Sequence, residues 1–383
     1  MIKIKVKSKD HDTFKFPLLG YLGYTIAKFF DSFKNISFFL DRFETIHLRN
    51  LIDKKSIDRP IYITGLARAG TTIILEMLSK HPDLASHRYK YLIMPYIPHW
   101  FSQMVKASKL YAKPFERFHR DGIFVTGESP EAVEEIFWQK FFKNTHNENS
   151  TNIINGSASN PRFESFYRNH IRKLIITQKS SRYLAKNNYN VTRMEYLLRL
   201  FPSSKFLLII RNPVNHIASL IKQTNLFAKL GSESPLLNEW LKIIGHREFG
   251  RYQVCINADN TELIQKIRRL WANKEKYIKG WANYWVSIYD FIANNLDANK
   301  KLKKATLIVR YDELCDTPAK IIDQILEHTE LPKAKFEKVR KYYINHLHQP
   351  TYYTPNFSDQ EMADIVEITN KTAARFGVHL KLN

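Results

Sequence analysis

The sequence contains few cysteines, only Cys255 and Cys315 among 383 residues. Two cysteines cannot form the disulfide framework of a small secreted domain, and their scarcity is typical of a protein from a reducing compartment. The first residues, Met-Ile-Lys-Ile-Lys-Val-Lys, lack the apolar core of a secretion signal. The chain also has no apolar run of about 18 residues, the length of a transmembrane helix. We therefore expect a cytoplasmic protein.

Acidic residues are scarce as well, with 37 Asp and Glu against 59 Lys and Arg, which gives a net charge of +22. Such an excess favours anionic partners, including nucleotides, nucleic acid and acidic membrane surfaces. A solvated lysine-rich surface is the plain alternative. Since no nucleic-acid-binding motif is recognisable, we expect no specific nucleic-acid partner, and a general polyanion-binding protein is the weakest of the functions considered.

The first 58 residues show no strand-like alternation, so we predict a helical N-terminal extension over 1–58 followed by a single domain over 59–383. Within the extension, residues 16–30 are apolar and aromatic but are interrupted by Pro17, Gly20 and Lys28. A packed helical arm is the favoured interpretation, and an anchor that contacts a membrane surface peripherally is the alternative.

Beyond residue 59, strand-like and helix-like segments alternate, which indicates an α/β fold with a central parallel sheet and helices on both faces. Strands are predicted at 60–65, 84–87, 182–186, 205–210 and 306–309. Helices are predicted at 71–80, 91–118, 130–142, 164–178, 192–200, from 213 onward, at 262–294, at 318–327, and on both sides of a C-terminal loop at 346–358. The polar segment 144–161 is expected to be a surface loop.

The segment 65–72 reads Gly-Leu-Ala-Arg-Ala-Gly-Thr-Thr and joins the first predicted strand to its helix. Two glycines allow the backbone to curl so that N–H groups face an anion at the helix N-terminus. The spacing resembles a Walker A loop, which predicts a P-loop-type three-layer sandwich, but Thr71 stands where the lysine belongs. That change disfavours a kinase or NTPase. Arg68 supplies a cation inside the loop instead, and a turn without a ligand is the plain alternative.

A second anion site is predicted at the end of the strand 205–210. Arg211 follows this strand, and ligands bind at the carboxyl ends of strands in open α/β sheets. Ser219 lies nearly two turns into the helix that starts at Pro213, and the planar guanidinium of Arg211 suits a phosphate. A strand-end salt bridge and a serine that bonds its own helix are the plain alternatives.

Together these segments resemble the sulfotransferases that use 3′-phosphoadenosine 5′-phosphosulfate (PAPS). The loop 63–72 is similar to the 5′-phosphosulfate loop of the branch with Arg-Ser-Gly-Thr-Thr, which includes tyrosylprotein and many bacterial sulfotransferases. The segment 205–219 resembles that family's 3′-phosphate motif. The segment 186–202 resembles the stretch in which a lysine faces the sulfuryl group, and 309–314, Val-Arg-Tyr-Asp-Glu-Leu, resembles its Tyr-Glu-x-Leu strand end.

The resemblance implies in-line, metal-independent transfer of the sulfuryl group from PAPS to a hydroxyl or amine, with 3′-phosphoadenosine 5′-phosphate (PAP) as product. It implies that Arg68 stabilises the transferring group and that Lys186 sits beside it. It further implies donor contacts from the residues Arg68, Ala69, Gly70, Thr71, Thr72, Arg211, Ser219 and Tyr311. Ala67 and Ala69 replace the usual proline and serine, so one hydroxyl near the 5′-phosphate is missing.

The general base is the weakest part of the match. The related branch has a glutamate about twenty residues after the loop arginine, whereas residues 86–90 read Ser-His-Arg-Tyr-Lys. His87 is the nearest competent group, unless it is simply a satisfied strand-end histidine. Glu131 is the second candidate, on a helix expected to start at Pro130 and to carry Glu135 on the same face, unless it only caps that helix. His119 and Asp121 are weaker options.

The acceptor is a small molecule, lipid or saccharide that the sequence does not specify. The N-terminal arm, the aromatic-rich region 91–118 and the helix around Trp281 are candidates to line its pocket. The loop 349–355, Gln-Pro-Thr-Tyr-Tyr-Thr-Pro, is a candidate to close over the donor, and a plain connection between helices is the alternative.

Overall fold

The computed structural model describes residues 18–108, 114–117, 119, 124–349 and 355–380. A five-stranded sheet in the order β2-β5-β1-β6-β7 lies at its centre, and all neighbouring strands are parallel. The strands of this sheet are β1 (Ile61–Thr64), β2 (Leu84–Ser86), β5 (Arg182–Lys186), β6 (Lys205–Ile210) and β7 (Thr306–Arg310). A separate antiparallel pair consists of β3 (Phe115–Glu116) and β4 (Phe124–Val125). The predicted α/β fold with a central parallel sheet is confirmed.

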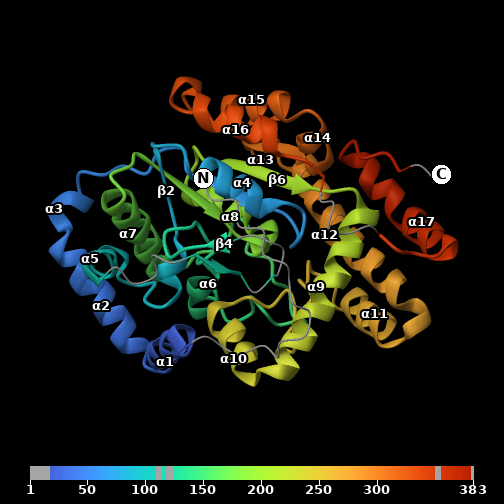
Figure 1. Cartoon of the computed structure of the whole chain (residues 1–383), viewed down its shortest axis with the longest axis horizontal. Coiled ribbons are helices and arrows are strands. Elements are labelled where there is room, and N and C mark those ends of the chain that lie inside the picture. The colour runs from blue at the N-terminus through green and yellow to red at the C-terminus, as the bar shows by residue number, and fades with distance from the viewer. Residues whose placement is uncertain (1–17, 109–113, 118, 120–123, 350–354, 381–383) are drawn as a thin grey trace.

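Successive side chains of each strand point to opposite faces of the sheet, and both faces are buried. Ile61 and Ile63 belong to one apolar core, while Tyr62 belongs to the other. In the same way, Leu207 packs on the first side and Phe206 on the second. The helices that cover the first side include α4, α15 and α16, and those on the second include α7, α8, α9 and α12 (Figure 1). The result is a three-layer sandwich.

The helices of the N-terminal half are α1 (Leu18–Ser32), α2 (Lys34–His47), α3 (Arg49–Ile52), α4 (Thr71–Leu78), α5 (Pro98–Ser108), α6 (Glu135–Phe141), α7 (Pro161–Thr177) and α8 (Met194–Leu200). Those of the C-terminal half are α9 (Pro213–Glu233), α10 (Pro235–Ile244), α11 (Thr261–Ala272), α12 (Tyr277–Ala298), α13 (Lys300–Ala305), α14 (Tyr311–Asp316), α15 (Pro318–His328), α16 (Glu337–His346) and α17 (Asp359–Arg375). Short 3₁₀ helices occur at Tyr89–Leu92, Asn188–Thr192, Lys274–Lys276 and Lys333–Lys335.

Three predicted helices differ from the structure. The helix expected from Pro130 starts only at Glu135, because Pro130 forms a bridge with Arg88 in an extended segment. The region 91–118 is helical mainly in α5, and Phe115 already belongs to β3. The helix expected over 262–294 is two helices, since the side chain of Asn273 accepts the N–H of Glu275 and starts a new turn.

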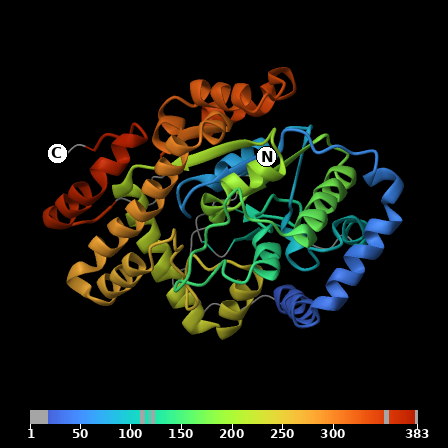
Figure 2. The same ribbon diagram turned by 180° about the vertical axis from the view of Figure 1, so that it is seen from behind.

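The predicted helical arm is present as α1, α2 and α3, which follow one edge of the molecule, with α5 and α7 on their inner side (Figures 1 and 2). The opposite edge is formed by α17 (Figure 1). Within the described ranges, no helix is both long and apolar enough to cross a membrane. The boundary at residue 58 stays a prediction.

Candidate active site

The carboxyl edge of the sheet brings together side chains from four segments of the sequence. Ile63 in β1 is in register with Lys186 at the end of β5, so Lys186 lies beside the loop that follows β1. Arg211 follows β6, and its guanidinium lies 5.2 Å from the ring centroid of Tyr311, which follows β7. The Nε of Arg68 donates to the Oγ of Ser219 over 3.3 Å. The two predicted anion-binding segments therefore meet.

The loop between β1 and α4 depends on two glycines with positive φ. Gly65 has φ of 143°, and a Cβ at this position would lie 2.4 Å from the carbonyl oxygen of Ile209. Gly70 has φ of 105°, and a Cβ there would lie 2.2 Å from the Tyr311 ring. Arg68 also has a positive φ of 71°, which is strained for a residue with a side chain. The loop thus packs closely on β6 and on Tyr311.

The buried side chain of His216 on α9 connects this loop to α12. Trp285 on α12 donates its indole N–H to Nδ1 of His216 over 3.1 Å, which places the ring proton of His216 on Nε2. Nε2 lies 2.8 Å from the carbonyl oxygen of Ala67 and therefore donates to it. Burial lowers the pKa of His216 to about 3, so the ring is neutral. Sequence reasoning missed His216, because a lone histidine in a helix gives no signal.

A polar chain runs from the loop to a carboxylate that the sequence did not single out. The Thr71 hydroxyl donates to the Oδ1 of Asn188 over 3.3 Å. The Nδ2 of Asn188 in turn donates to Oε1 of Glu248 over 2.9 Å. The other oxygen, Oε2, is buried without a hydrogen-bond partner in the described part of the chain, and Nδ1 of His246 lies 3.3 Å from it. The only local signal was a charged segment after Gly245, the glycine that ends α10.

Lys186 lies between charges of both signs. Burial lowers its pKa, the carboxylates of Glu131 and Glu248 act in the opposite direction, and the guanidinium groups of Arg117 and Arg68 lower it further. Lys186 therefore lies within electrostatic range of these two carboxylates and two guanidinium groups. Arg68 and Glu131 are, like Lys186, predicted catalytic residues. Glu248 was not predicted.

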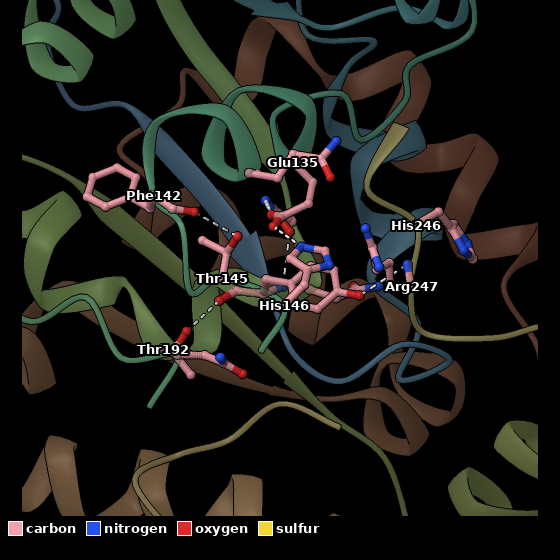
Figure 3. Close-up of polar contacts among 12 residues, drawn as sticks. Glu135, Phe142, Thr145, His146, Thr192, His246 and Arg247 are labelled. Carbon is pink, nitrogen blue, oxygen red and sulfur yellow. Dashed lines mark hydrogen bonds and ion pairs between the residues drawn. The ribbon is translucent and has the colours of Figure 1, made fainter. Parts of the chain in front are cut away.

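The buried carboxylate of Glu135 anchors the segment that follows Lys186, and Figure 3 shows Glu135 with its neighbours. Glu135 accepts hydrogen bonds from both terminal nitrogens of Arg193, at 2.7 and 2.9 Å, and from Nδ2 of Asn187 at 2.8 Å. His146 points at the same carboxylate, with Nε2 at 2.6 Å (Figure 3). Burial alone would raise the pKa of Glu135, but Arg193 and His146 outweigh it and the net shift is downward. Because Asn187 lies between Lys186 and Asn188, this network positions both.

The candidate bases differ in their surroundings. His87 is buried, with Nε2 at 2.9 Å from Nε2 of His170 and Nδ1 at 3.1 Å from the Tyr183 hydroxyl. Burial lowers the pKa of His87 to about 3, so its placement gives no support to a role as base. Glu131 is half-buried, and one of its carboxylate oxygens accepts the N–H of Ala132 at 2.6 Å.

The weaker option His119 is half-buried, and burial together with the charges of Arg117 and Arg68 lowers its pKa. Asp121 lies outside the described residues, as does most of the loop 349–355. Glu131 and Glu135 do not share a helix face, since α6 begins only at Glu135. The structure thus places Arg68 and Glu131 within electrostatic range of Lys186. Both ring nitrogens of His87 are instead engaged by core residues.

A family model described as the sulfotransferase family matches residues 60–253, which is 194 of the 383 residues. The chain therefore belongs to the sulfotransferase family. The matched part contains the loop 65–72, Lys186, Arg211, Ser219 and Glu248, whereas Tyr311 lies beyond it.

Solved structures are similar to this one at low sequence identity. Sulfotransferase STF9 from Mycobacterium avium has a TM-score of 0.53 and 14% identity, over 89% of this chain and 83% of that chain. Sulfotransferase STF1 from Mycobacterium tuberculosis H37Rv has a TM-score of 0.47 and 14% identity, over 93% of this chain and 86% of that chain. The likeness to STF9 shows a shared fold. No curated protein matches the chain.

Proposed function

We propose that this protein transfers the sulfuryl group of PAPS to a hydroxyl or amine of an acceptor and releases PAP. The observation that carries the proposal is the contact between Arg68 and Ser219 at 3.3 Å, which joins the two predicted anion-binding segments across 151 residues of sequence. A donor with phosphates at both its 3′ and 5′ positions requires two such segments at one sheet edge. A mononucleotide with a single phosphate chain does not.

The residues present fit such a donor. The Nε of Arg211 is buried and has no hydrogen-bond partner within the described residues, although the guanidinium packs on Tyr311. Arg211 and Ser219 would hold the 3′-phosphate. The hydroxyls of Thr71 and Thr72, with the first N–H groups of α4, would hold the 5′-phosphate, because these amides have no partner within the helix.

The chemistry requires little beyond positioning and charge. When bound, PAPS supplies a sulfuryl group joined to a phosphate leaving group. Arg68 and Lys186 stabilise the negative charge that develops on the leaving oxygen. Either carboxylate beside Lys186, Glu131 or Glu248, would take the proton of the acceptor, and the charges of both oppose the lowering of the Lys186 pKa by burial.

Binding of PAP tests the donor without knowledge of the acceptor. Calorimetry on the purified full chain should show binding of PAP, and Arg211→Ala should weaken it about 10- to 100-fold, the value of charge-assisted hydrogen bonds to a phosphate. Arg162→Ala, at an exposed position on α7, is the matched control and should bind like wild type.

Two results would contradict the donor assignment. Tight binding of magnesium–ATP with no binding of PAP would favour a P-loop-type kinase or NTPase. Equal binding of PAP and of unrelated nucleic acid, lost together as salt increases, would favour a general polyanion-binding protein. Circular dichroism of Arg211→Ala, and the milder change Arg211→Lys, separate loss of the site from loss of the fold.

A second experiment identifies the base. A panel of phenols, saccharides and lipids is screened with labelled PAPS, and the variants Glu131→Gln and Glu248→Gln are then assayed on the best acceptor. Loss of the base should lower kcat about 10²- to 10⁴-fold and leave the affinity for PAP unchanged. If both variants retain wild-type kcat, neither carboxylate is the base.

The two free, buried cysteines support a cytoplasmic location for this activity, as proposed from the sequence.

A further inference from the structure

The N-terminal arm presents several large apolar side chains to solvent, and the rings of Phe39 and Phe43 lie 4.3 Å apart. Four of them lie on α2 at helical spacing and two on α1, and we call this set the apolar face. Its members are Tyr21, Phe29, Ile36, Phe39, Phe43 and Ile46. Each is exposed over 38% to 58% of its surface. Single exposed apolar residues are ordinary, but six large ones on two successive helices favour an interaction site.

The side of the arm opposite the apolar face is packed against the body of the protein. Ser37 and Glu44 are buried, and the ring of Phe38 packs against Tyr96 with centroids 5.5 Å apart. Lys173 on α7 pairs with Asp41 at 2.8 Å and with Glu44 at 3.2 Å. The arm is therefore docked with a fixed side facing outward.

Charges on the arm are sorted by sign. All three acidic residues between 18 and 52 pair with or are buried against the body: Asp31 pairs with Lys140, and Asp41 and Glu44 pair with Lys173. The basic residues Lys28, Arg42 and Arg49 are exposed, and Arg49 lies 3.7 Å from the exposed carboxylate of Asp53, which follows α3. Residues 1–17, which precede the arm, add five lysines and only two aspartates. The outward side thus combines apolar and positively charged groups.

We propose that the apolar face docks this protein on the surface of an anionic lipid bilayer, with α1 and α2 lying in the plane of the interface. Aromatic and aliphatic side chains of an interfacial helix enter the headgroup region, and flanking basic residues attract anionic lipids. The contact that we propose is peripheral, and no helix of the described ranges is able to span a membrane. The arm precedes the matched segment 60–253, so this inference does not rest on the proposed donor.

Sedimentation with sucrose-loaded vesicles tests the proposal on the full chain. Wild type should bind vesicles of phosphatidylcholine with phosphatidylglycerol, bind vesicles of phosphatidylcholine alone more weakly, and lose affinity as salt increases. The double variant Phe39→Gln with Phe43→Gln should lower the partition coefficient at least about tenfold. Tyr342→Gln, which removes an exposed aromatic ring on α16, is its control and should bind like wild type.

The contribution of charge is tested separately. Arg42→Gln with Arg49→Gln should lower binding to anionic vesicles about fivefold or more and leave binding to neutral vesicles unchanged. Lys300→Gln with Lys301→Gln, exposed on α13, gives the matched loss of two charges elsewhere. These variants change exposed side chains, so an unaltered melting temperature confirms that each is folded.

Three outcomes would overturn the proposal. Wild type could remain in the supernatant with anionic vesicles at low salt, or the Phe39 and Phe43 double variant could bind as well as wild type. Analytical ultracentrifugation could also show a dimer that this double variant dissociates, together with no binding to vesicles, and the apolar face would then belong to a second copy of the chain. PAP calorimetry on the same samples reports the donor site independently.

Discussion

Glu134 and Glu135 are adjacent in the sequence but ionise in opposite ways. Burial raises the pKa of Glu134 to about 7, and its Oε1 accepts hydrogen bonds from the hydroxyls of Tyr167 and Tyr183, the latter at 2.7 Å. Glu135 is equally buried, but Arg193 lowers its pKa. At Glu134 burial outweighs the hydroxyl donors, which favour the charged form, whereas at Glu135 the direct pair with Arg193 outweighs burial. The two glutamates therefore serve different structural purposes.

The raised pKa of Glu134 predicts a pH dependence of stability. Its pKa is about 7 in the folded state and 4.5 in an unperturbed carboxyl group, so the folded protein binds more protons between these values. The stabilising contribution is complete below about pH 4.5 and is lost as pH rises through 7. Glu134→Gln cannot ionise, so between pH 5 and 8 it should gain about 2–3 kcal/mol relative to wild type.

Urea unfolding of both proteins at pH 5 and pH 8 measures this difference. Histidines with lowered pKa contribute equally to both proteins, so they cancel in the comparison. A difference in unfolding free energy between variant and wild type that is the same at the two pH values would contradict the ionisation assigned to Glu134.

At the scale of elements, the same sequence signature gave one correct and one wrong helix start. Asn212 and Ser129 each precede a proline. The side chain of Asn212 accepts the N–H of Val214 at 3.0 Å and starts α9 at Pro213, as predicted. The Oγ of Ser129 instead accepts the N–H of Thr126 at 3.0 Å and closes a turn that precedes it. A capping side chain has partners on both sides, and local sequence does not choose between them.

The docking of α2 on α7 depends on one buried cation. Lys173 is fully buried and pairs with Asp41 and Glu44, of which Glu44 is also fully buried. Burial raises the pKa of Glu44, and Lys173 opposes this shift. Lys173→Met should destabilise the protein by about 3 kcal/mol or more, since it leaves two carboxyl groups without their cation.

Urea unfolding with circular dichroism measures this loss. The triple variant Lys173→Met, Asp41→Asn and Glu44→Gln removes all three charges and should recover part of the stability, because no buried charge is then left unpaired. A loss below about 1 kcal/mol for Lys173→Met would show that the arm is held by apolar packing alone.

At the scale of the whole molecule, the net charge of +22 has more than one origin. Part of it surrounds the candidate active site, where Arg68 and Arg117 both lie within electrostatic range of Lys186. Another part is on the outward side of the arm, which lies at the edge of the molecule opposite α17 (Figure 1). Composition predicted anionic partners but not that two separate surfaces carry the charge.

The sequence by itself determined the alternating order of strands and helices and the bounds of β5 and β6, and it led to the prediction that Arg68, Gly70, Arg211 and Ser219 belong to anion-binding segments. These features follow from local properties: apolar runs, glycine and proline positions, and the spacing of charged residues. They were sufficient to indicate the family before any three-dimensional information.

Only the tertiary structure decided which distant residues meet. The sheet order places β1 between β5 and β6, and this brings Arg68 to Ser219, Ala67 to His216 and Thr71 to Asn188. It also buried His87 and added Glu248 to the group around Lys186. Contacts across more than 100 residues depend on strand order, register and burial, and no local periodicity encodes these.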